Sequence, residues 1–193
     1  MQTAEAPEFS LQRPVPSALA VIRAVLFSPK SFYLNFSPDG PIKEPALFAL
    51  LVGAVTGVLA AAVAILSGLI FGEVSAEVVG LTALEALLFA LLSPLAVGAV
   101  AGVYLLSIRT FVGKVASFRE VYRVAAYAFG AFVLAWIPVV GSFAVTYALM
   151  VLMGLGIQSA YKTSFLTTVV TAFVGFLPVA LILVWITIAQ VAS

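Results

Sequence analysis

The sequence predicts an all-α polytopic membrane bundle with five transmembrane helices and an N-terminal interfacial amphipathic helix. Of its 193 residues, 64% are hydrophobic and only 9% are charged, whereas a soluble domain is roughly one-quarter charged. Four stretches carry no charged side chain: 28 residues after Glu44, 23 after Glu85, 38 after Arg123 and 31 after Lys162. Because a helix needs roughly 20 apolar residues to cross the hydrocarbon core, the longest stretch fits a hairpin and each other stretch fits one crossing.

The chain before the first predicted span divides into two parts. Residues 1–16 carry three prolines among polar residues, and proline disfavours helix at the residue before it, so we expect a mobile cytoplasmic tail there. Residues 17–44 begin with Leu19, Ile22, Val25 and Leu26 at helical spacing. This stretch is too short to span and suits an amphipathic segment that lies along the membrane interface.

The remaining residues, 45–193, form the predicted transmembrane domain. Its helices are expected at about residues 45–71, 83–108, 118–137, 141–161 and 165–190. Thr82 with Glu85, and Ser117 with Glu120, match the capping-box pattern and would start helices two and three. The charge-free part of helix three holds only 14 residues, which rise about 21 Å. A re-entrant hairpin of helices three and four is therefore the alternative to two full crossings.

The basic residues predict the orientation. Four of the nine lysines and arginines precede the first span, four follow the second and one follows the fourth. Short loops rich in Lys and Arg stay in the cytoplasm. We therefore expect a protein of the cytoplasmic (inner) membrane, with its N-terminus in the cytoplasm and, after five crossings, its C-terminus outside.

Basic side chains of the predicted cytoplasmic face are candidate contacts for lipid or a partner protein. They are Arg23, Lys30, Arg109, Lys114, Arg119 and Arg123. Near an anionic membrane surface each basic residue contributes about 1 kcal/mol. The competing interpretation is that the cluster at 109–123 only sets the topology, since every multispanning protein needs such a signal.

Glu85 is a candidate transport site, because a carboxyl group in a membrane is by default a functional candidate. A structural explanation competes with this one and is favoured: with Thr82, Glu85 would cap a helix at the outer interface. Pro94 and Pro178 interrupt helices two and five, and each removes a backbone hydrogen bond and predicts a kink.

Two Gly-x-x-x-Gly pairs predict close helix packing. Gly53 with Gly57 lies in the first span, and Gly98 with Gly102 lies in the second. Without side chains, two helices can approach closely at such positions. Packing within one chain is the expected use, and the interface of a homo-oligomer is the alternative.

Residue types that most enzymes need are missing. The sequence has no cysteine and no histidine, and Asp39 is its only aspartate. This excludes disulfides, thiolate nucleophiles, imidazole bases and the commonest transition-metal ligands, and it leaves no histidine to activate a serine. We therefore expect no enzymatic activity, no cofactor and no metal site. So few basic residues also argue against a nucleic-acid partner.

Four segments follow one another in a distinctive order and spacing. They are LFSPKSFY at 26–33, SFREVYRVAAY at 117–127, IPVVG at 137–141 and GLG at 154–156. Together they resemble the prokaryotic branch of the Yip family, named for Ypt/Rab-interacting proteins. The resemblance covers about residues 18–190 and implies a five-span bundle with a cytoplasmic N-terminus.

The resemblance also suggests a class of function. Eukaryotic members of the family look like adaptors of vesicle traffic that bind small GTPases of the Rab type. This sequence shows neither their long hydrophilic N-terminal domain nor their Asp-Leu-Tyr-Gly-Pro signature, so we do not expect GTPase binding. We predict a non-enzymatic membrane scaffold or adaptor that engages lipid headgroups or a partner protein through its cytoplasmic face. The rival hypothesis is a small permease or channel with a path between kinked helices two and five.

Overall fold

The computed structural model describes residues 5–113 and 116–192. Its elements are α1 (Pro14–Phe27), α2 (Pro29–Asn35), α3 (Lys43–Phe71), α4 (Ala76–Phe111), α5 (Phe118–Ala128), the 3-10 segment η1 (Phe129–Leu134), α6 (Val140–Thr146), the π-helical segment η2 (Tyr147–Leu152), α7 (Met153–Tyr161) and α8 (Phe165–Ala192). The described residues form helices and no strand. The predicted all-α polytopic bundle is confirmed.

Four helical stretches are long and apolar enough to cross a membrane. Among the described residues these are Lys43–Phe71, Ala76–Phe111, Val140–Tyr161 and Phe165–Ile182. The third joins α6, η2 and α7 into one continuous rod. Each corresponds to one of the apolar stretches that the sequence separates by charged residues.

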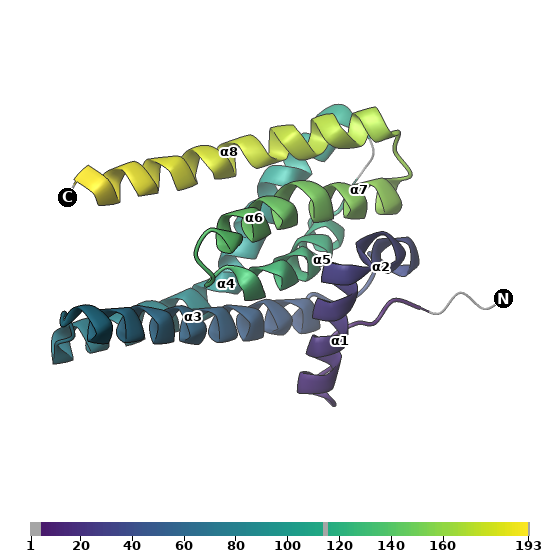
Figure 1. Ribbon diagram of the computed structural model, residues 1–193. Coiled ribbons are helices and arrows are strands. Elements are labelled where there is room, and N and C mark those ends of the chain that lie inside the picture. Colours follow the sequence, from purple (N-terminus) through teal and green to yellow (C-terminus); the bar gives the residue numbers. More distant parts are fainter. Residues whose placement is uncertain (1–4, 114–115, 193) are drawn as a thin grey trace.

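The predicted third span, residues 118–137, differs from these four. It forms α5, with 11 residues, followed by η1, with 6 residues, and the two together rise about 28 Å. The Thr56 hydroxyl, at the middle of α3, donates to the Phe132 carbonyl at 3.0 Å. The turn between η1 and α6 consequently stops short of the far ends of α3 and α8 (Figure 1).

That turn is tight. Val139 adopts a φ of 67°, and Gly141 packs so closely on the Ala135 backbone that a Cβ atom would have no room. The packed backbone explains why the IPVVG segment carries a glycine at its last position.

Helices α3 and α4 form an antiparallel hairpin with a fixed register. A Cβ atom on Gly57 would lie 2.8 Å from the Ala86 carbonyl oxygen, and one on Gly53 would lie 2.5 Å from Ser93 Oγ. The Ser93 hydroxyl also donates to the Ala49 carbonyl of α3 at 2.9 Å. The small residues let the two backbones approach, and the serine bond fixes their relative position.

Helix α4 begins earlier than the sequence pattern suggests. Ser75 is its N-cap, with its hydroxyl oxygen accepting from the Val78 amide at 3.2 Å. Thr82 lies inside the helix and donates to the Val78 carbonyl at 2.8 Å. The prediction that Thr82 and Glu85 cap a helix starting at Ala83 is therefore wrong, because the earlier serine satisfies the free amides first.

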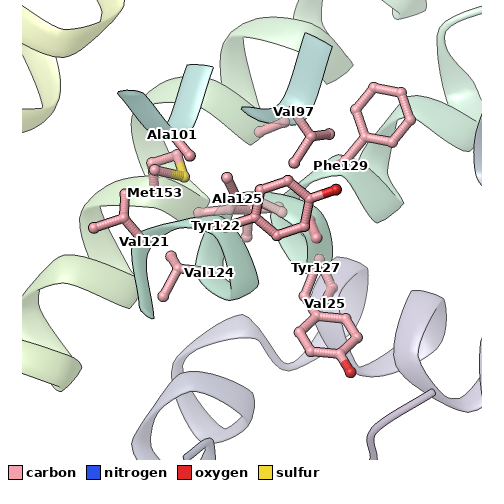
Figure 2. Close-up of a cluster of buried hydrophobic side chains, with 14 of the residues drawn as sticks. Val25, Val97, Ala101, Val121, Tyr122, Val124, Ala125, Tyr127, Phe129 and Met153 are labelled. Carbon is pink, nitrogen blue, oxygen red and sulfur yellow. The ribbon is translucent and has the colours of Figure 1, made fainter. Parts of the chain in front are cut away.

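Helix α5 lies at the centre of the bundle. Its residues from Val121 to Ala128 are all buried, packed among α1, α3, α4 and α7 (Figures 1 and 2). Tyr122 rests against Gly98 of α4 and donates its hydroxyl to the Pro94 carbonyl at 3.1 Å. The start of α5 is capped by Ser117, whose hydroxyl oxygen accepts from the Glu120 amide at 3.2 Å.

Residues 5–42 form an N-terminal cap over one end of this bundle. The cap consists of the segment before α1, the helices α1 and α2, and the loop to α3. Helix α1 runs across the direction of α3 (Figure 1), and α1 and α2 meet at a bend of 117°. The cap therefore covers the bundle end from which α3 starts.

Buried polar contacts attach α2 to the bundle. The Tyr33 hydroxyl donates to the Val124 carbonyl at 3.4 Å, and the Ser159 hydroxyl donates to the Tyr33 carbonyl at 2.5 Å. Burial, and secondarily the nearby Tyr147, raise the pKa of the Tyr33 phenol above its ordinary value. This phenol therefore stays protonated and serves as a structural hydrogen-bond donor.

Candidate functional site

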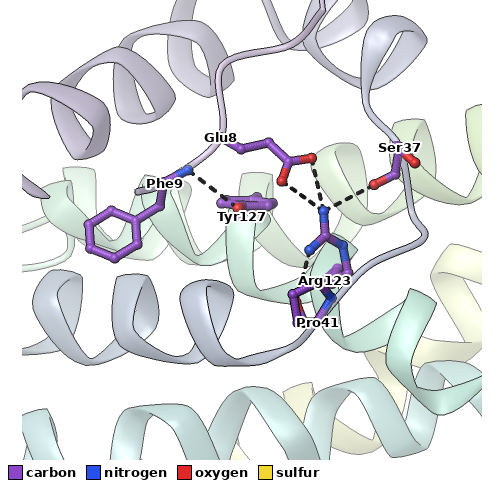
Figure 3. Close-up of polar contacts among 6 residues, drawn as sticks. All are labelled: Glu8, Phe9, Ser37, Pro41, Arg123 and Tyr127. Carbon is purple, nitrogen blue, oxygen red and sulfur yellow. Dashed lines mark hydrogen bonds and ion pairs between the residues drawn. The ribbon is translucent and has the colours of Figure 1, made fainter. Parts of the chain in front are cut away.

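Arg123 ties the N-terminal cap to the centre of the bundle (Figure 3). Its Nη2 donates to both carboxylate oxygens of Glu8 at 2.8 Å and to the Ser37 carbonyl at 3.3 Å. Its Nη1 donates to the Pro41 carbonyl at 2.9 Å, and its guanidinium lies over the Phe36 ring. The Arg123 side chain is only 4% exposed, so one cation organises three parts of the cap.

Two neighbours shape the space around this arginine. Gly40 has a φ of 140°, and a Cβ atom there would lie 2.9 Å from Arg123 Nη1. The buried hydroxyl of Tyr127, one helical turn after Arg123, accepts from the Phe9 amide at 3.4 Å. The prediction that Arg123 contacts lipid or a partner is therefore wrong, because its charge is used inside the molecule.

The segment predicted as a mobile tail, residues 1–16, is packed wherever the structure describes it. Ala6 and Phe9 are buried, the Ala6 amide donates to the Asn35 carbonyl at 3.2 Å, and Glu8 pairs with Arg123. Pro14 begins α1, where its missing amide hydrogen costs nothing. The expected mobility is wrong because these few apolar side chains find a complementary surface on α3 and α5.

Helix α1 has one packed face and one open face. Its buried residues are Ala18, Val21 and Val25. The open face, which we call the α1 stripe, carries exposed side chains at four-residue spacing: Val15, Leu19, Arg23 and Phe27. Of the four apolar residues predicted to lie along the interface, only Leu19 is exposed, since Val25 is buried and Ile22 and Leu26 pack against the core.

The other predicted basic contacts gather at the same end of the molecule. Lys30 in α2, Arg109 in the last turn of α4 and Arg119 in the first turn of α5 are exposed. Arg109 also donates to the Ala116 carbonyl at 3.4 Å. Lys114 lies outside the described residues. With Arg23, these side chains place exposed positive charge around the N-terminal cap.

Glu85 faces a large cavity. The cavity has a volume of about 1060 Å³ and lies between α4, α5 with η1, α6 with η2, and α8. Its α4 wall runs from Glu85 to Val100, and its α8 wall includes Phe176 and Val179. Among the described lining residues, Glu85 alone can carry a charge, and Ser93, Ser142 and Thr146 are the other polar ones.

The depth of Glu85 follows from the register of the hairpin. Its neighbour Ala86 packs on Gly57, which lies midway along α3. From that level the hairpin tip at Gly72 is about 14 or 15 residues away, or roughly 22 Å along the helix. Glu85 therefore lies well inside the apolar part of the hairpin and away from its tip.

The two prolines stand inside continuous helices. α4 passes through Pro94 and α8 passes through Pro178 without a break. Pro94 deprives the Ala90 carbonyl of its helical donor, and the Ser93 hydroxyl shares its single hydrogen between this carbonyl at 2.8 Å and the Ala49 carbonyl at 2.9 Å. Both prolines neighbour the cavity, next to its lining residues Ser93 and Val179.

The two glycine pairs behave differently. Gly53 and Gly57 bring α3 and α4 together, which is packing within the chain. Gly98 meets the Tyr122 ring at 3.6 Å, an ordinary contact, and Gly102 has no neighbour within 4 Å of a Cβ position. The prediction of close helix packing at Gly102 is wrong among the described residues, because no helix backbone approaches that side of α4.

Sequence reasoning missed several residues of these two sites. Glu8 falls in the predicted tail, and only its acidic side chain ahead of the amphipathic helix indicates that it can pair with a cation. No sequence pattern predicts the π-helical segment η2, which forms part of the cavity wall, because a π-helix arises from packing. There the Tyr104 hydroxyl donates to the Leu149 carbonyl, and such bulges are frequent at functional sites.

Comparison with known proteins identifies the family. Residues 23–188 match the model of the Yip1 domain, which covers well over half of the chain. No match was found among curated proteins or among solved structures. Together with the four long apolar helices, this match shows that the chain is a multi-pass membrane protein of the Yip family.

Proposed function

We propose that this protein is a non-enzymatic membrane scaffold or adaptor whose N-terminal cap engages lipid headgroups. The observation that carries the proposal is the α1 stripe: an exposed apolar row, interrupted by Arg23, on a helix that runs across the spanning helices. A helix of this kind lies in the interface plane with its apolar face among the acyl chains.

The composition of the stripe favours a lipid surface over a protein partner. Val15 and Leu19 are each more than half exposed, and Arg23 follows them at the next step of the same row. A long arginine side chain can keep its apolar stem in hydrocarbon and its charge among headgroups. Exposed Lys30 and Arg119 would add attraction to anionic lipid.

The same arrangement supports the proposed orientation. The described basic residues lie at the end covered by the N-terminal cap, and the α3–α4 hairpin tip carries acidic Glu73 and Glu77 with no basic residue. Basic ends stay in the cytoplasm. The proposal therefore puts the cap on the cytoplasmic side of the inner membrane and the hairpin tip outside.

The test is reconstitution into vesicles of mixed diameter and of defined anionic lipid content. We expect the wild type to concentrate in small vesicles that contain phosphatidylglycerol, because an interfacial helix inserts more readily where lipid packing is loose. Val15→Asn with Leu19→Asn should abolish this enrichment. Protein density per membrane area, measured on single vesicles, is the readout.

Ala20→Asn is the matched control, because Ala20 is also exposed on α1 but lies outside the stripe. Its enrichment should equal that of the wild type, and both variants should retain the wild-type melting temperature. If the double variant still sorts as the wild type does, α1 does not engage lipid and the proposal fails. If the protein is enriched in small vesicles only when a purified protein partner is present, the N-terminal cap recognises a protein and not lipid.

A small permease is the second candidate, and the cavity between α4 and α8 is the observation that favours it. The cavity lies next to Pro94 and Pro178 and contains Glu85. Flux of ions and small metabolites from proteoliposomes, abolished by Glu85→Gln, would support this candidate. No flux above that of empty liposomes would leave the scaffold as the better account.

A further inference from the structure

The cavity contains a carboxyl group that the protein leaves without a partner. Among the described residues, Glu85 makes no hydrogen bond and no ion pair. It is exposed at the edge of the cavity, and its neighbours on α4, Leu88, Phe89 and Leu92, are exposed apolar side chains that lie among acyl chains once the helix spans the membrane. A carboxyl group in apolar surroundings is costly unless another group pairs with it. Its retention at this depth points to a partner that comes from outside the chain.

The shape of the cavity restricts what that partner is. On α4 the lining residues from Glu85 to Val100 follow one helix face, and their 15 steps extend about 22 Å. One bilayer leaflet is about 15 Å of hydrocarbon, half of roughly 30 Å. The cavity is therefore long enough for an extended alkyl chain, and its volume is at the upper end of the range of about 300–1,000 Å³ for ligand sites.

The residues that line the cavity indicate which chemical groups the ligand carries. Away from Glu85 the wall toward Met153 and Ala125 is apolar, which suits an alkyl chain. At Glu85 the complementary group is a cation that can also donate hydrogen bonds, and an amine does both. An anionic head, as in a fatty acid, would be repelled at the same position.

We propose that this cavity binds a long-chain amphiphile with an amine headgroup, with the amine at Glu85 and the alkyl chain directed toward Met153. The site is separate from the α1 stripe, so it holds whether or not α1 engages lipid. It also requires binding only, without transport across the membrane.

The experiment is native mass spectrometry of the full-length protein titrated with three C16 probes. The probes are hexadecylamine, 1-hexadecanol and hexadecanoic acid, which differ only in the headgroup. We expect hexadecylamine to bind with a stoichiometry of one and at least 10-fold more tightly than the other two. Glu85→Gln should remove that preference and leave the weak binding of the alcohol unchanged.

Two further variants keep the result interpretable. Glu77→Gln removes an exposed acid at the start of the same helix, outside the cavity, and should bind hexadecylamine as the wild type does. Ala96→Phe places a ring in the cavity and should weaken all three probes several-fold. Equal binding of the three probes by the wild type, or undiminished amine binding by Glu85→Gln, would overturn the proposal.

Discussion

Arg123 and Glu85 each border a long apolar stretch of the sequence, yet their surroundings are opposite. Arg123 is buried and bonded to Glu8, Ser37 and Pro41. Glu85 faces a cavity and has no partner among the described residues. The bonds of Arg123 hold the N-terminal cap on the bundle. Glu85 has no internal partner within the described part of the chain, so its carboxyl group can interact with a ligand.

The contrast extends to the elements that carry the two residues. Arg123 lies on α5, whose residues from Val121 to Ala128 are buried and which is packed under the N-terminal cap. Glu85 lies on α4 nearer to the α3–α4 turn than Pro94 and Gly98, the positions that Tyr122 of α5 contacts. The cavity that it lines lies between α4, α5 with η1, α6 with η2, and α8.

The largest expected effect is that of Arg123→Met. It would leave Glu8 without its cation and the Ser37 and Pro41 carbonyls without a donor, and removing one partner of a buried pair costs about 3 kcal/mol or more. We expect a clear loss of thermal stability and rapid proteolysis between residues 5 and 13. Arg119→Met, at an exposed position four residues earlier, should change neither; equal effects of both would show that Arg123 does not hold the cap.

The next largest effect on stability is expected from substitutions in the two glycine pairs. Gly57→Ala would place a methyl group 2.8 Å from the Ala86 carbonyl oxygen, and forcing apart a close-packed contact costs about 1–3 kcal/mol. Gly102→Ala meets nothing within 4 Å and should stabilise α4 by up to about 1 kcal/mol, from helix propensity. Melting temperatures in detergent should move in opposite directions, and a shared direction would contradict the hairpin register.

A smaller contrast concerns the two acids at Glu85 and Glu120. Glu120 accepts from the Tyr161 hydroxyl at 3.0 Å and from Ser117 at 2.8 Å, so Glu120→Gln should cost about 1 kcal/mol. Glu85→Gln loses no contact and should leave stability unchanged or slightly higher. Thermal unfolding of the ligand-free protein measures both, and a destabilised Glu85→Gln would indicate an internal partner for that acid.

The smallest expected difference is one of labelling rate. With no cysteine in the chain, Glu73→Cys at the hairpin tip and Val139→Cys in the η1–α6 turn can be labelled singly. We expect a membrane-impermeant maleimide added outside to modify position 73 several-fold faster, because the turn stops short of the tip. Equal rates would show that α5 and η1 cross the membrane completely.

The sequence determined much of the fold for a physical reason: hydrocarbon excludes charge, so charge-free stretches mark spans directly. It could not determine where α4 begins, since Ser75 and Thr82 are both competent caps and apolar helix continues between them. It also could not show that α5 becomes a 3-10 segment after Ala128, because that change follows from packing against α3.

The candidate sites were less predictable. Counting basic residues groups Arg123 with Arg119, but the structure buries the first and exposes the second, since burial is decided by residues far away in the sequence. Glu85 was noticed as an acid in an apolar stretch, yet its depth depends on the contact of Ala86 with Gly57. Contacts with residues distant in the sequence therefore determine both the burial of Arg123 and the depth of Glu85.

The depth of α1 in the membrane decides whether the N-terminal cap engages lipid. A fluorophore on Leu19→Cys, in proteoliposomes with nitroxide-labelled lipids, reports whether the α1 stripe lies in the membrane interface. We predict that nitroxides near the headgroup quench this fluorophore most strongly, while aqueous iodide quenches it weakly. Strong quenching by iodide with no effect of any lipid nitroxide would place α1 in water and contradict the proposed lipid-engaging scaffold.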